Sequence, residues 1–128
     1  MRSLPVLIER VADGRTIRLE MYRGQIVGLN RALLTGTSTP ETRAEMFITR
    51  DASRVFLKRE KHRIFLCNYH RNSIYVGDYK LTTGNRICVL GETVAFRVSS
   101  HVDGAERVRF LIDTEDDGGL TESVVEEF

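Results

Sequence analysis

Hydrophobic and polar residues alternate along much of this chain. In TIRLEM (16–21) every second residue is apolar, while Arg18 and Glu20 fall on the opposite face. TVAFRVS (93–99) and VRFLI (108–112) repeat the pattern. A period of two residues predicts strands with one buried and one exposed face. Short apolar or alternating segments predict further strands at 6–11, 24–29, 45–49, 54–59, 63–67, 74–77 and 86–90.

Turn-forming residues separate these segments, as in ADGR (12–15) and TTGN (82–85). No stretch of about ten residues carries the 3.6-residue period of a helix. Segment 31–44, rich in threonine and interrupted by Pro40, is expected to be the longest irregular connection. Short strands at this spacing predict an all-β fold, an antiparallel β-sandwich of about ten to eleven strands.

Composition agrees with one soluble globular domain. The chain has 128 residues, of which 41% are hydrophobic and 29% charged. No apolar run approaches the roughly 18 residues of a membrane-spanning helix. Cys67 and Cys88 lack the spacing of metal ligands and are too few for a disulfide scaffold. We therefore expect an intracellular protein, in cytoplasm or nucleus, with no membrane association, metal or cofactor.

Charge is distributed unevenly along the sequence. All 19 lysines and arginines precede residue 110, and seven of the 18 acids lie in 113–128. Residues 1–112 therefore hold 11 acids against 19 bases, a net charge of +8. This predicts a basic domain over 1–112 and a disordered acidic tail over 113–128. A basic domain attracts phosphate-bearing partners, although its charge can equally serve only to offset the tail.

Four motifs, in matching order and spacing, resemble a forkhead-associated (FHA) domain over roughly residues 5–112. They are GLNR (28–31), SRVF (53–56), NSIYVGD (72–78) and LGETVAF (90–96). The resemblance implies an FHA-like sandwich that recognises phosphothreonine at loops at one end.

The sequence also departs from the family pattern. Asn30 replaces a glycine, Phe56 replaces a histidine, and Ser73-Ile74 replaces Gly-Thr. The replaced histidine normally braces the binding loops. The chain is thus identified as a divergent member of the family.

Phosphothreonine brings nearly two negative charges and three acceptor oxygens, so its site needs cations and short neutral donors. By resemblance, Arg31 and Ser53 would hold the phosphate, and Asn72 would bond the peptide main chain. Arg54 and Arg71 would add positive field. Taken singly, each of these residues also fits an ordinary strand end or turn.

Two other functions stay open. Phe56 has the opposite parity from its buried neighbours, so a sheet face can serve as a phosphate-independent dimerisation or assembly surface. Tyr69, Tyr75 and Tyr79 near Arg71 can stack on nucleic-acid bases, although tyrosines in strands usually pack across a sheet.

No catalytic signature is present. His62, His70 and His101 lie on turn segments without patterned cysteine or acidic partners, which argues against a metal site or a nucleophile triad. The sequence therefore predicts a non-enzymatic module that binds phosphothreonine in a partner protein.

Overall fold

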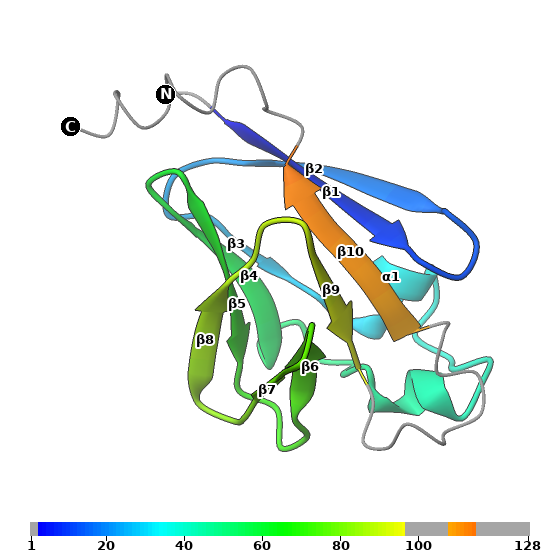
Figure 1. The fold of residues 1–128 in the computed structure, drawn as a ribbon. Coiled ribbons are helices and arrows are strands. Elements are labelled where there is room, and N and C mark those ends of the chain that lie inside the picture. Colours follow the sequence, from blue (N-terminus) through cyan, green and yellow to red (C-terminus); the bar gives the residue numbers. More distant parts are fainter. Residues whose placement is uncertain (1–2, 97–107, 115–128) are drawn as a thin grey trace.

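A computed structural model describes residues 3–96 and 108–114, which form two antiparallel sheets packed as a sandwich (Figure 1). The six-stranded sheet has the order β2-β1-β10-β9-β6-β7, and the four-stranded sheet has the order β3-β4-β5-β8. The predicted all-β sandwich is confirmed. The strands are β1 (Leu4–Arg10), β2 (Thr16–Met21), β3 (Ile26–Gly28), β4 (Val55–Glu60), β5 (Arg63–Asn68), β6 (Ile74–Val76), β7 (Tyr79–Leu81), β8 (Asn85–Cys88), β9 (Glu92–Ala95) and β10 (Arg109–Thr114).

Alternating residues of both sheets build the core between them. In β4, Val55 and Leu57 are buried while Phe56 and Lys58 remain half-exposed. Each fully buried aliphatic side chain contributes about 1.5–3 kcal/mol. The fully buried side chains include Val6, Ile8, Leu57, Leu66, Phe110 and Ile112.

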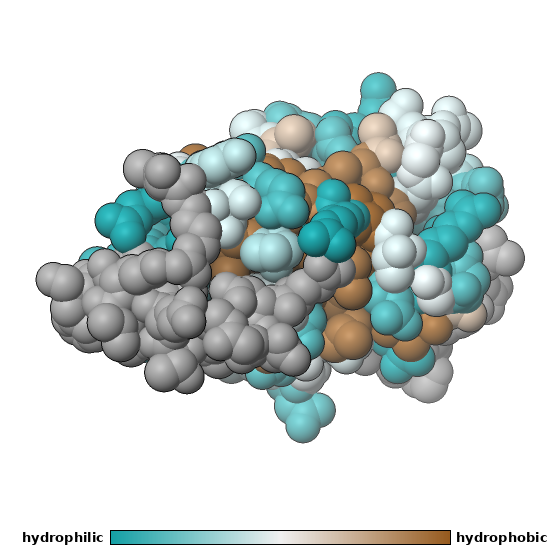
Figure 2. Space-filling model, turned by 90° about the horizontal axis from the view of Figure 1, so that it is seen from above, coloured by the Kyte–Doolittle hydropathy of each residue, from teal (hydrophilic) through white to brown (hydrophobic). Residues whose placement is uncertain are grey.

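The six-stranded sheet is the wider of the two, and its edge strand β2 is incompletely covered. Ile17 and Leu19 point to the core side but are only half-buried. Figure 2, seen from above the view of Figure 1, shows hydrophobic residues reaching the surface, with hydrophilic side chains between them. Among the described residues, this side of the sandwich therefore presents apolar surface between its polar side chains.

The connection between β3 and β4 contains two helical turns, α1 (Arg31–Thr35) and η1 (Ala44–Phe47). Asn30 caps α1, because its side chain accepts a hydrogen bond from the Leu33 N–H, at 2.9 Å. Gly36 ends the helix in a left-handed conformation with φ of 87°, which glycine adopts without steric cost. The segment predicted to be irregular thus carries local order.

The structure differs from the predicted strands in several places. Segment 45–49, predicted as a strand, instead holds most of η1, because the Arg31 guanidinium engages three of its carbonyls. Strand β7 was not predicted. β10 extends two residues past the boundary expected at 112. Three parts of the sequence predictions lie outside the described residues: the remainder of the predicted tail, residues 97–99 of one predicted strand, and His101.

Within residues 3–96 and 108–114, no helix is long and apolar enough to cross a membrane.

Candidate functional site

Two loops meet at one end of the four-stranded sheet. The Tyr69 N–H donates to the Arg54 carbonyl at 2.6 Å, which joins the start of β4 to the segment after β5. The Leu29 N–H donates to the Val55 carbonyl at 2.8 Å and brings the end of β3 alongside. We call the resulting group the basic end; it consists of Ser53, Arg54, His70, Arg71 and Asn72.

Asn68 fixes the loop that carries His70, Arg71 and Asn72. This fully buried side chain donates to the carbonyls of Asn72, at 3.1 Å, and Leu81, at 2.9 Å. Its own carbonyl oxygen accepts from the His70 N–H, at 2.9 Å. Because one amide satisfies three backbone groups, the loop geometry depends on this residue.

The turn that carries Ser53 packs directly on β3. A Cβ atom at Gly28 would collide with the Cβ and carbonyl oxygen of Ala52. Glycine at 28 therefore permits the close approach that places Ser53 at the sheet end.

The exposed Asp51 begins this turn and places its carboxylate beside Ser53 and Arg54. Its Oδ1 accepts from the Ser53 N–H at 2.9 Å and from the Ser53 hydroxyl at 2.7 Å. Its Oδ2 lies 3.6 Å from the Arg54 Nε. The Ser53 hydrogen bonds, and secondarily Arg54, lower the pKa of Asp51. A carboxylate thus already engages two of the groups predicted to bind an anion.

Arg71 and Asn72 lie next to this turn. Arg71 is exposed, and no hydrogen bond or ion pair engages its guanidinium among the described residues. The Asn72 N–H donates to Nδ1 of His70 at 3.2 Å. Burial, then the fields of Arg71 and Arg54, lowers the pKa of His70. The positive charges of Arg54 and Arg71 thus both act on the His70 imidazole, so these three side chains lie close to one another.

Arg31 is positioned differently from the other four predicted site residues. It is buried, with 7% of its surface exposed. Its guanidinium donates to the carbonyls of Ser38 at 2.7 Å, Glu45 and Ile48 at 3.0 Å, and Met46 at 3.3 Å. Burial, followed by Arg50, lowers its pKa. In this arrangement Arg31 holds the long β3–β4 connection together.

Phe56 lies on the outer face of β4, as its parity predicted, and stacks on Tyr69. The ring centroids are 5.8 Å apart and the planes differ by 16°. The loops are therefore braced by three contacts: the Phe56–Tyr69 stack, the Asn68 amide and the Arg31 guanidinium. Of these residues, only Phe56 occupies the position at which the FHA resemblance led us to expect a histidine.

The structure thus brings Ser53, Arg54, Arg71 and Asn72 together and places Arg31 beneath a neighbouring loop. Asp51 and Asn68 were missed by the sequence reasoning. Asp51 had a recognisable signal, since an aspartate two residues before a serine often closes a local turn. Asn68 had none, because only its burial under the loop reveals its role.

No protein-family model matches the chain, and no curated protein matches it. Among the residues that the structure describes, no group of three or more histidine, cysteine or acidic side chains is arranged to hold a metal ion.

Proposed function

We propose that this protein is a phosphothreonine-dependent interaction module that docks a phosphorylated partner at the basic end. The observation that carries the proposal is the convergence of the Ser53 hydroxyl, Arg54 and Arg71 at one sheet end. Ser53 and Arg54 already lie against the exposed carboxylate of Asp51. A phosphate would offer the same donors more charge and more acceptor oxygens.

The proposed roles follow from exposure. Ser53, Arg54 and Arg71 are exposed and would contact the phosphate, while half-buried Asn72 would bond the peptide main chain. Arg31 would act as a positioning residue, because its donors are engaged by four carbonyls. This assignment differs from the direct phosphate contact that the FHA resemblance implied for Arg31.

The expected affinity is modest. A hydrogen bond to a charged group contributes about 1.5–3 kcal/mol, so two or three of them suffice for micromolar binding. Ser53 and Arg54 must first leave Asp51, which reduces the net gain.

A panel of phosphothreonine peptides and their unphosphorylated twins tests the proposal by titration calorimetry. We expect binding only to phosphorylated peptides, with a loss of about tenfold or more for Arg54→Ala and for Arg71→Ala. Arg18→Ala removes an exposed arginine from β2 and serves as the control. Equal affinity for both twins would reject the proposal. Salt-dependent binding of single-stranded oligonucleotides instead would favour the nucleic-acid alternative.

A second candidate function is phosphate-independent self-association through the outer face of the four-stranded sheet. Phe56, Phe65 and Ile26 share this face, and Ile26 is 53% exposed. Arg86 lies 4.2 Å from the Phe65 ring centroid and covers part of the face. Light scattering on the wild-type chain and on Phe56→Ser tests this candidate; a wild-type monomer at high concentration would exclude it.

A further inference from the structure

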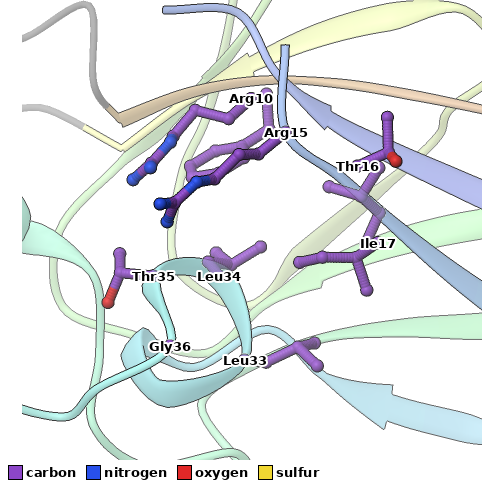
Figure 3. Close-up of a pocket in the computed structure, with 10 residues that line it drawn as sticks. Arg10, Arg15, Thr16, Ile17, Leu33, Leu34, Thr35 and Gly36 are labelled. Carbon is purple, nitrogen blue, oxygen red and sulfur yellow. The ribbon is translucent and has the colours of Figure 1, made fainter. Parts of the chain in front are cut away.

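A pocket of about 260 Å³ lies between the β1–β2 hairpin and α1. It shares no residue with the basic end. Its polar rim is formed by Arg10, Arg15, Thr16 and Thr35 (Figure 3). Apolar side chains form the floor: Ile8, Ile17, Leu33, Leu34 and Phe110.

Two arginines lie side by side on this rim. Figure 3 shows Arg10 and Arg15 extending in the same direction across the pocket from Leu33 and Leu34. Both arginines share one carboxylate, since Asp13 binds Arg10 at 2.7 and 3.1 Å and lies 3.6 Å from Arg15. Arg10 is therefore held in a bidentate pair, whereas Arg15, with 74% of its side chain exposed, has donors to spare.

This combination selects the chemistry of a ligand. A guanidinium above an apolar floor fits a carboxylate that stands next to an aliphatic or aromatic group. A free phosphate would leave the floor uncovered, and a purely apolar group would leave Arg15 unused.

The acidic end of this chain has that chemistry. Residues 115–128 contain six acids and no lysine or arginine, and VVEEF (124–128) places apolar residues beside carboxylates. β10 ends at Thr114, only four residues beyond Phe110 of the pocket floor. That separation is about 14 Å along a strand, whereas 14 residues can span roughly 46 Å.

We propose that segment 115–128 docks into this pocket of its own chain, with a carboxylate on Arg15 and a neighbouring apolar side chain on the floor. The segment's negative charge then neutralises part of the basic domain, and its apolar residues cover the half-buried Ile17. This proposal does not depend on phosphothreonine binding.

Amide resonances of the full-length ¹⁵N-labelled protein provide the test. We expect Glu126→Gln/Glu127→Gln, Val124→Ser/Val125→Ser and Arg15→Gln each to move the signals of Leu34 and Gly36. In the Arg15→Gln background, the two glutamine changes should cause little further movement, because the partner is already lost. Arg18→Gln makes the same charge change on β2 and should leave the effect of the tail changes intact.

Three outcomes would overturn the proposal. The first is that the signals of Leu34 and Gly36 stay in place when residues 124–127 are substituted. The second is that they move only at high protein concentration, which would assign the pocket to the tail of a second copy. The third is that the tail changes move the signals of Arg54 and Arg71, which would place the tail on the basic end. Unchanged signals from the central strands confirm that each variant is folded.

Discussion

The basic end and the pocket between the β1–β2 hairpin and α1 both place arginines around an aspartate. They differ in how tightly that aspartate is held. Asp13 forms a bidentate pair with Arg10 at 2.7 and 3.1 Å. Asp51 is held mainly by the Ser53 hydroxyl, and Arg54 stands 3.6 Å away. The loosely held carboxylate can be exchanged for another anion, while the bidentate pair is a fixed part of the structure.

The surroundings sharpen this difference. The Ser53 hydroxyl and the side-chain amide of Asn72 are small polar donors beside the arginines of the basic end, which suits a compact phosphate. Ile17 and Leu33 offer apolar surface beside the arginines of the pocket, which suits a carboxylate on a hydrophobic segment. The same residue type therefore serves two ligand classes, and its neighbours decide which.

The largest effect is expected where an arginine is buried. Arg31→Ala removes donors from four carbonyls and should lower the free energy of unfolding by about 3 kcal/mol. Arg54→Ala, at an exposed position, should change it by no more than about 0.5 kcal/mol. Urea denaturation measures both. If Arg31→Ala kept full stability but lost phosphopeptide binding, Arg31 would be a ligand rather than a brace.

An intermediate effect, on phosphopeptide affinity, is expected from removing the negative charge of Asp51. Asp51→Asn frees the donors of Ser53 and Arg54 and removes a like charge from the path of the phosphate. Affinity for a phosphothreonine peptide should rise several-fold in calorimetry. Asp13→Asn is the matched control and should leave this affinity unchanged. A weaker affinity in Asp51→Asn would mean that Asp51 organises the turn for binding rather than competing with the ligand.

The two aspartates should also titrate differently. The hydrogen bond from Arg10 lowers the pKa of Asp13 to about 2. Since the ionised form is favoured in the folded state, its stabilising contribution is present above about pH 4 and is lost as the pH falls toward about 2. Carboxyl ¹³C resonances report both groups. Arg10→Gln should raise the pKa of Asp13, and Ser53→Ala should raise that of Asp51; no change in either variant would exclude these partners as the cause.

The smallest effect is expected at His70. Burial, Arg71 and Arg54 lower its pKa, so the neutral imidazole is favoured in the folded state. Its stabilising contribution is present above about pH 6.5 and is lost as the pH falls through the lowered pKa. Arg71→Gln should raise this pKa, and a bound phosphate should raise it further. An NMR titration of the imidazole measures both changes. If the pKa of His70 were the same with and without phosphopeptide, His70 would not be part of the binding site.

The sequence predicted the sandwich well because its strands alternate between core and surface, as Val55 to Lys58 illustrate. It failed at 45–49, where apolar residues resembled a strand. There the buried Arg31 guanidinium donates hydrogen bonds to the backbone carbonyls that would otherwise pair with a neighbouring strand. Such long-range competition leaves no periodic signal in the chain.

The candidate site was predictable only in part. The FHA resemblance implied that the loops carrying Ser53-Arg54 and Arg71-Asn72 lie at one end of the sandwich. Hydrogen bonds between β4 and β5 bring these two loops together. The burial of Arg31 could not be predicted, because it depends on how the connection after α1 folds over the guanidinium.

One measurement tests the central claim most directly. Full-length ¹⁵N-labelled protein is titrated with a degenerate phosphothreonine peptide library and, separately, with its unphosphorylated counterpart. We predict saturable movement of the amide signals of Ser53, Arg54, Arg71 and Asn72 with the phosphorylated library alone. Signals that stay in place, or that move equally with both libraries, would contradict phosphothreonine recognition at the basic end.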